Sequence, residues 1–108
     1  MITHVKIGEF TYTVVEVDEP KLGDDDTRDG LHACIQFSTC TIQLRREMDT
    51  TMKIVALLHE ILHAIGRQAG LEFEPGEFTE EKFVITFSHG LLALLRHNPE
   101  LVEFLTDD

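Results

Sequence analysis

The sequence has few cysteines, no long apolar run and no leader-like beginning. Cys34 and Cys40 are its two cysteines in 108 residues, too few for a disulfide scaffold or a cysteine-rich zinc site. No apolar run approaches the roughly 18 residues of a membrane span, and residues 1–6 lack the basic-then-apolar order of a signal peptide. We therefore expect a cytoplasmic protein without a membrane partner, stabilised by its core or by a metal held by other ligands.

Basic residues are also scarce. Nine lysines and arginines face twenty acidic residues, which leaves a formal net charge of -11. A field of this sign repels phosphate, so the composition argues against direct binding of nucleic acid and of anionic membrane surfaces. The length and the 43 % hydrophobic content fit one globular domain over residues 1–108.

Two stretches of alternating apolar residues predict two β-hairpins. The first turns at Gly8-Glu9, and its inward residues are Val5, Ile7, Phe10, Tyr12 and Val14. The second turns at Ser38-Thr39, and its inward residues are Ala33, Ile35, Phe37, Cys40, Ile42 and Leu44. This register sends Cys34 to the opposite face from Cys40, so we expect no disulfide between them. The acidic segment 19–30 lacks the spacing of a helix-loop-helix calcium site and is predicted to be a loop.

Three helices are predicted in the second half of the chain. The first spans residues 50–68, with Asp49 or Thr50 as its N-cap and Gly66 and Gly70 as late breakers. Its centre is apolar almost all round, which is typical of a buried helix. A second helix should run from residue 79 to 96 or 97. A short third one should follow Asn98-Pro99 and continue through residue 105.

The sequence His59-Glu60-Ile61-Leu62-His63 lies within the first of these helices. Residues four apart on a helix differ by about 40° around its axis, so both imidazoles aim at one point, as two zinc ligands do. Glu60 can then reach a metal-bound water and act as general base in metal-assisted hydrolysis. The competing interpretation is a pair of core histidines beside a stray glutamate. We favour zinc because an unpaired carboxylate on a buried helix is costly unless something compensates it.

A catalytic zinc usually has a third protein ligand. The candidates downstream are Glu72, Glu74, Glu77, Glu80, Glu81, His89 and His97. On a helical wheel of the second helix, Glu80 and Glu81 both project into its apolar arc, and the wheel does not choose between them. His97 points nearly away from Glu81. His89 lies at the edge of the arc and suits substrate binding or an outer shell better than metal ligation.

Residues 57–66, together with Glu81, Val84 and Phe87 and with Leu91-Leu92, resemble the zincin-type metallopeptidases of the ImmA/IrrE-like group, especially small phage and prophage members. The resemblance covers about residues 31–105. It implies an α+β minimal zincin: a small antiparallel sheet of two hairpins packed on an active-site helix and a glutamate-bearing helix, with a short C-terminal helix. It also implies Glu81 as third ligand. Val84 replaces the alanine of the family's Glu-x-x-Ala segment, so Glu80 stays open.

The predicted function is that of a zinc endopeptidase acting on a specific protein or peptide. Some relatives in the family cleave transcriptional repressors, so the resemblance implies a regulatory role, as in a phage-encoded protein. The alternative is a zinc-stabilised protein-binding module, catalytically weak or inactive, that sequesters a host factor. An oxyanion-stabilising residue is not evident, because Tyr12 is the single tyrosine and His89 is only a candidate. Residues 41–45 directly precede the active-site helix, so we expect an open strand edge there that binds substrate, unless the first hairpin covers it.

Overall fold

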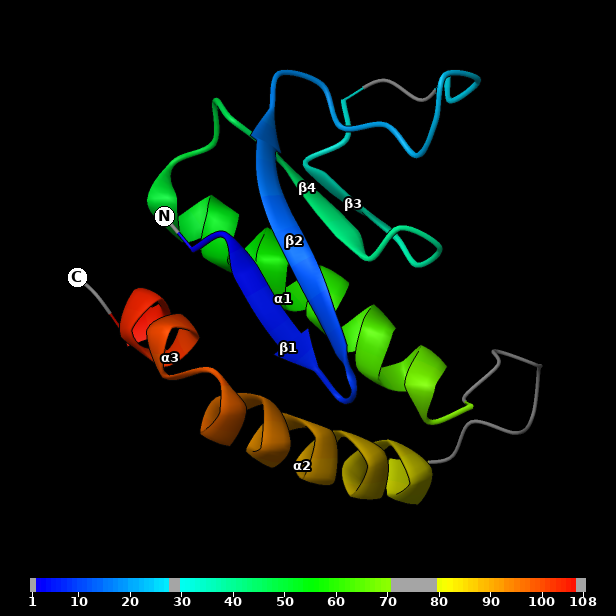
Figure 1. Cartoon of the computed structure of the whole chain (residues 1–108), viewed down its shortest axis with the longest axis vertical. Coiled ribbons are helices and arrows are strands. Elements are labelled where there is room, and N and C mark those ends of the chain that lie inside the picture. The colour runs from blue at the N-terminus through cyan, green and yellow to red at the C-terminus, as the bar shows by residue number, and fades with distance from the viewer. Residues whose placement is uncertain (1, 28–29, 71–79, 107–108) are drawn as a thin grey trace.

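The computed structural model describes residues 2–27, 30–70 and 80–106, without side-chain placement for residues 80–82, 84, 85 and 88. The chain forms a small α+β domain (Figure 1). Its elements are β1 (His4–Ile7), β2 (Phe10–Val17), β3 (Ala33–Gln36), β4 (Thr41–Arg45), α1 (Thr50–Gln68), α2 (Glu80–His97) and α3 (Pro99–Thr106). The two predicted hairpins and three predicted helices are confirmed.

The register inside each hairpin is as predicted. Val5 pairs with Tyr12 in the first hairpin, and Ile35 pairs with Ile42 in the second. Gly8 at the first turn has φ 61°, a left-handed conformation that glycine adopts without steric cost. Phe10 departs from the prediction because 54 % of it is exposed. Phe10 is the first residue of β2, next to the turn, so it lies at the tip of the hairpin, beyond the buried core.

The sheet is mixed rather than antiparallel throughout. Its strand order is β1-β2-β4-β3, and β2 runs parallel to β4 with Val14 opposite Ile42. Strand β3, which follows β2 along the chain, lies at the outer edge of the sheet, and β4 lies between β3 and β2. Ile42 and Leu44 on this central strand are fully buried. The predicted open edge at residues 41–45 is therefore wrong, because β4 is paired on both sides.

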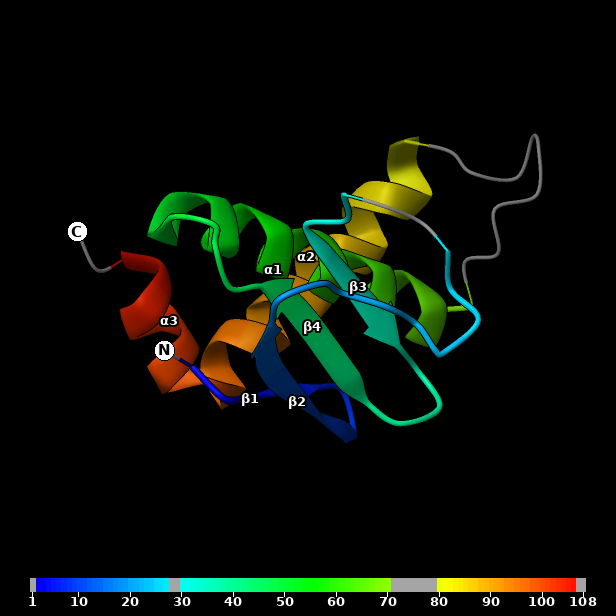
Figure 2. The same cartoon turned by 90° about the horizontal axis from the view of Figure 1, so that it is seen from above.

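The helices cover one face of the sheet (Figure 2). Helix α1 packs across β3 and β4, and α2 lies beside α1 and β1. Leu57, Ile61 and Ala64 of α1 are fully buried in a core that they share with the inward residues of β1, β2 and β4. None of the helices in the described part of the chain has the length and apolar character needed to cross a membrane.

Helix α1 begins and ends as its sequence dictates, with one exception. The carboxylate of Asp49 accepts a hydrogen bond of 2.8 Å from the backbone N–H of Met52, so Asp49 is the N-cap. Gly70 has φ 73° just after the last turn, a typical helix stop. Gly66 is not a breaker. It is buried within the helix, and a Cβ placed there would lie 3.6 Å from Cζ of Phe87.

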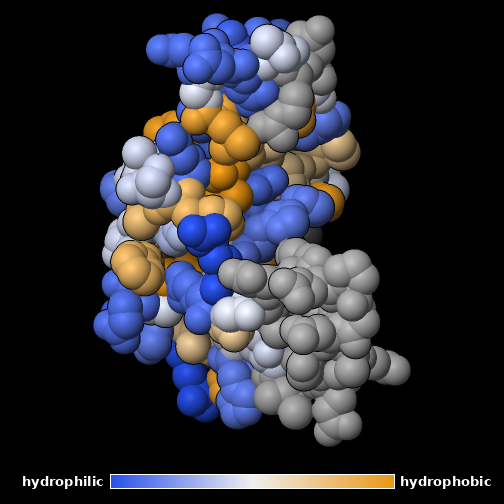
Figure 3. All heavy atoms as spheres, turned by 90° about the vertical axis from the view of Figure 1, so that its right-hand side faces the viewer, coloured by the Kyte–Doolittle hydropathy of each residue, from blue (hydrophilic) through white to orange (hydrophobic). Residues whose placement is uncertain are grey.

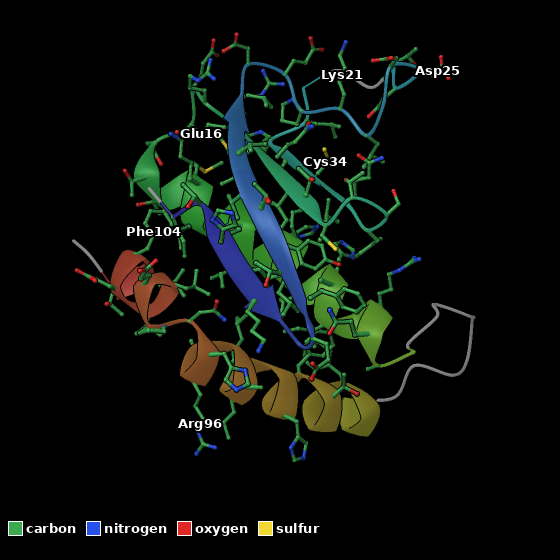
Figure 4. All side chains as sticks on the ribbon, viewed as in Figure 1. Glu16, Lys21, Asp25, Cys34, Arg96 and Phe104 are labelled. Carbon is green, nitrogen blue, oxygen red and sulfur yellow. The ribbon has the colours of Figure 1, made fainter. Side chains whose placement is uncertain are left out.

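The other face of the sheet is partly covered by the loop after β2. Pro20 is fully buried, and the backbone N–H of Lys21 donates to the side-chain oxygen of Gln43 at 2.8 Å. Figure 4 shows Lys21 at the end of the sheet where Cys34 also lies. Cys34 is 7 % exposed on this face, which separates it from Cys40. No disulfide joins the two cysteines, as predicted.

Candidate metal centre

His59 and His63 lie one turn apart on α1 and turn their rings toward each other. Their Nε2 atoms are 3.1 Å apart, and the ring planes are inclined by 70°. Two imidazole nitrogens bound to a tetrahedral zinc lie about 3.3 Å apart, given the usual zinc–nitrogen distance. Without a metal, the same separation suits a hydrogen bond in which one Nε2–H donates to the other ring. The pair therefore fits a divalent metal with very little movement.

Glu60 lies on the inner side of the same turn and is only 8 % exposed. Burial raises the pKa of its carboxyl above the ordinary value, while the neighbouring His59 and His63 act in the opposite direction. The structure thus places a largely buried carboxyl directly beside the two histidines.

Glu60 and His59 line a cavity of about 360 Å³ between α1 and the start of β3. Three more α1 residues and two residues at the start of β3 complete the lining, which consists of His32, Ala33, Met52, Val55, Ala56, His59 and Glu60. The sequence did not reveal His32 and Ala33, because nothing local to them relates them to a helix that begins at residue 50. The one hint in the sequence was that both residues lie at the start of a predicted strand whose hairpin precedes the active-site helix.

The outer edge of β3 borders this cavity. The backbone N–H of Arg45 donates to the carbonyl of His32 at 2.9 Å. In an antiparallel ladder the direction of the backbone groups alternates, so those of Cys34 and Gln36 face β4 and those of Ala33 and Ile35 face outward. No strand among the described residues pairs with these outward groups. We call the backbone of Ala33 and Ile35 the β3 edge.

The third ligand falls outside what the structure describes. Glu81 is the second residue of α2, but its side chain and that of Glu80 are not among the described ones, and Glu72, Glu74 and Glu77 lie in the range 71–79. The exposed His89 and His97 are described. Within the described residues, no group of three or more metal-binding side chains comes together. His97 lines another cavity, with Asn98 and residues of β1.

Tyr12 lines a different cavity from Glu60, together with Cys40 and Arg67. Burial raises the pKa of its phenol, the Cys40 thiol adds to the rise, and Arg67 lowers it. The structure thus brings together His59, Glu60 and His63 and gives Tyr12 other neighbours.

No protein-family model, no curated protein and no solved structure matches this chain.

Proposed function

We propose that this protein is a cytoplasmic zinc-dependent endopeptidase that cleaves a specific protein substrate, of the ImmA/IrrE-like kind. The observation that supports this best is the convergence of the His59 and His63 Nε2 atoms to 3.1 Å beside the buried carboxyl of Glu60, at the wall of a cavity. Chance matches to a five-residue motif have no reason to coincide with such a cavity.

In this proposal His59 and His63 hold the metal, with Glu81 as third ligand. A zinc ion held there would supply Lewis-acid chemistry, lowering the pKa of a coordinated water to about 7 and polarising the substrate carbonyl. The carboxylate of Glu60 takes a proton from the attacking water and later passes it to the nitrogen of the leaving amine. Its position supports this role, because Glu60 follows His59 directly on α1 and lines the same cavity.

The β3 edge gives the proposed substrate a place to bind. An extended peptide that adds to the sheet there gains hydrogen bonds from the backbone of Ala33 and Ile35, whatever its sequence. One of its side chains would enter the cavity of Met52, Val55 and Ala56. The apolar lining favours an aliphatic or aromatic side chain close to the scissile bond.

The alternative, a zinc-stabilised binding module without activity, has its own support. Four side chains on α2 are large, apolar and between 37 % and 48 % exposed: Phe83, Leu91, Leu92 and Leu95. Apolar side chains gathered on one surface helix are typical of a protein-binding face. Figure 4 shows Arg96 of the same helix pointing away from the sheet. Loss of cleavage in every assay, with zinc still bound, would favour this alternative.

Zinc content tests the proposal. Purified protein should contain about one zinc per chain by mass spectrometry of the metal, and its removal should lower the melting temperature, because a ligand that binds the native state stabilises it. His59→Ala and His63→Ala should lose the metal, whereas His97→Ala is the matched control and should keep it. Full occupancy in either of the first two variants would refute the assignment.

The third ligand is tested by a second pair of variants. Glu81→Ala should reduce zinc affinity far more than Glu80→Ala. Equal losses would show that the two carboxylates share the site or that the proposed alignment with the family is shifted.

A further inference from the structure

A second cavity of about 380 Å³ lies at the far end of β3, near the last turn of α1. Phe10, Tyr12 and Phe37 give it aromatic walls, and Ser38, Arg67 and Gln68 add polar groups. The amide of Gln68 is held in place, since its Nε2 donates to the carbonyl of Ile7 at 2.8 Å. The cavity is thus apolar at its sides, with a positive charge in its lining.

Arg67 supplies that charge, and the part of the chain that the structure describes offers it no carboxylate partner. Its guanidinium carbon lies 4.4 Å from the centroid of the Phe37 ring, and no acidic side chain among the described residues forms an ion pair with it. Two other cations of this acidic chain are paired with carboxylates: Arg46 contacts Asp18 at 2.6 Å, and Lys53 contacts Glu16. Stacking on Phe37 leaves the edge of the guanidinium available for a planar anion.

The two cavities lie at the two ends of β3. His32 and Ala33 at its start line the cavity with Glu60, and Phe37 and Ser38 just after its end line the cavity with Arg67. On α1, Arg67 follows His63 by one turn, on the same side of the helix. At about 3.3 Å per residue, an extended segment along the β3 edge would span the two cavities with four or five residues.

Figure 3 shows the side of the molecule on which β3 is the outermost strand. Its described surface is largely hydrophilic, with apolar side chains exposed mainly in the upper half. A positively charged cavity with aromatic walls therefore differs from the rest of a chain whose net charge is -11. The cavity with Arg67 therefore favours anionic ligands, which the remaining acidic surface repels.

We propose that the Arg67 cavity binds a carboxylate carried on an apolar body, the aromatic walls holding the body and the guanidinium the carboxylate. The inference about its source rests on the proposed function. In a peptidase the carboxylate belongs to an acidic residue of the bound segment, four or five positions from the residue in the cavity beside Glu60. The other source with the same chemistry is a free aromatic or aliphatic acid.

Intrinsic fluorescence tests the cavity directly, because Tyr12 is the single tyrosine and the chain has no tryptophan. The probes are hydrocinnamate and hydrocinnamide, which share a shape but not a charge. We expect wild-type protein to bind the acid about tenfold more tightly than the amide, since a charge-assisted bond to the guanidinium forms only with the acid. Arg67→Gln should remove this preference and still bind the amide, whereas Arg46→Gln, the matched control, should retain the preference. Equal binding of acid and amide by wild type, or a preference that survives in Arg67→Gln, would overturn the proposal.

Two blocked peptides then distinguish the sources. They carry the same alternating threonine and valine residues and differ by one glutamate or glutamine, and they are titrated into the Glu60→Gln variant to prevent cleavage. Binding of the glutamate peptide at least about tenfold more tightly than hydrocinnamate supports the peptide as source, because the β3 edge adds backbone hydrogen bonds. Binding no tighter than that of hydrocinnamate overturns it in favour of a free acid. Arg67 is not among the proposed metal ligands, so Arg67→Gln should keep its zinc, and failure here is distinguishable from failure of the proposed function.

Discussion

The two outer edges of the sheet differ in whether their outward backbone groups have hydrogen-bond partners among the described residues. At the β1 edge, the side chain of Asn98 accepts a hydrogen bond from the backbone N–H of Lys6 at 2.7 Å and donates one to its carbonyl at 2.8 Å. A buried amide thus takes the place of another strand. At the β3 edge, no described residue does the same for Ala33 and Ile35. An exposed edge invites pairing with other chains, and this protein closes the one that lies far from His59 and Glu60.

The difference extends to the packing of the two strands. Val5 and Ile7 of β1 are 0 % and 2 % exposed, because α2 packs against this strand. On β3, Ala33, Ile35 and Gln36 are only half-buried, and the cavity with Glu60 begins at its first residue. The β3 edge, which no described strand covers, therefore borders the cavity that contains Glu60.

Proline substitutions on β3 should have the largest effect on stability, and they test which of its backbone groups face outward. Cys34→Pro removes a backbone N–H that faces β4 and should cost about 3 kcal/mol or more of unfolding free energy. Ala33→Pro removes an outward N–H and should cost much less, since no ladder bond is lost. Denaturant unfolding measures both. Equal losses would show that the β3 edge is engaged after all.

Removal of the Asn98 side chain should open the closed edge. Asn98→Ala deletes both bonds to Lys6 and a third of 2.7 Å to the carbonyl of Leu94, so we expect a loss of about 2–3 kcal/mol in unfolding free energy. Lys6→Ala is the control, because only the backbone of Lys6 is used, and it should change stability by less than about 0.5 kcal/mol. A similar effect of the two substitutions would contradict the role given to Asn98.

A smaller effect is expected at Cys40, in the turn that precedes β4, where the backbone conformation can be tested by substitution. Cys40 has φ 49°, a left-handed conformation that costs a residue with a Cβ about 1 kcal/mol. Both Cys40→Gly and Cys40→Ala lose the thiol, but only glycine relieves the backbone. The glycine variant should therefore be more stable than the alanine variant by about 1 kcal/mol in thermal or denaturant unfolding. An alanine variant of equal or greater stability would rule out strain at this turn.

The smallest expected effect is the titration of Tyr12. Its phenol should lose its proton above the ordinary value of 10.0, chiefly because of burial. Because the pKa is higher in the native state than in the unfolded state, the protonated phenol contributes to stability. This contribution is complete below pH 10 and is lost as the pH rises through the native pKa. Absorbance of the phenolate reports Tyr12 alone, and titration in denaturant gives the unfolded reference. A native midpoint at or below the denatured one would contradict the prediction.

The parts of this fold that depend on local patterns were predictable. Alternation fixed the pairing of Val5 with Tyr12 and of Ile35 with Ile42, and the Asp49 cap and the last apolar turn marked the ends of α1. The parallel pairing of β2 with β4 was not predictable, because it depends on which strand of the second hairpin packs beside β2, and both strands have the same alternating pattern. For the same reason the sequence placed the open edge on residues 41–45 instead of on β3.

The candidate site divides in the same way. His59, Glu60 and His63 share one helix, so their spacing alone predicted that the two imidazoles converge, and the structure confirms it. The cavity depends on His32 and Ala33, which are far from α1 in sequence, and so does the closure of the other edge by Asn98. Such contacts arise only when elements that are distant in sequence pack together, so no local sequence pattern predicts them.

Cleavage of a whole-cell protein extract tests the central claim most directly. Zinc-loaded wild-type protein and Glu60→Gln are incubated with the extract, and newly formed N-termini are identified by mass spectrometry. The account predicts a small set of new N-termini with wild-type protein, reduced at least about a hundredfold with Glu60→Gln because the general base is lost, while both proteins contain the same amount of zinc. The same new N-termini at equal yield with Glu60→Gln, or none with zinc-loaded wild-type protein, would contradict it.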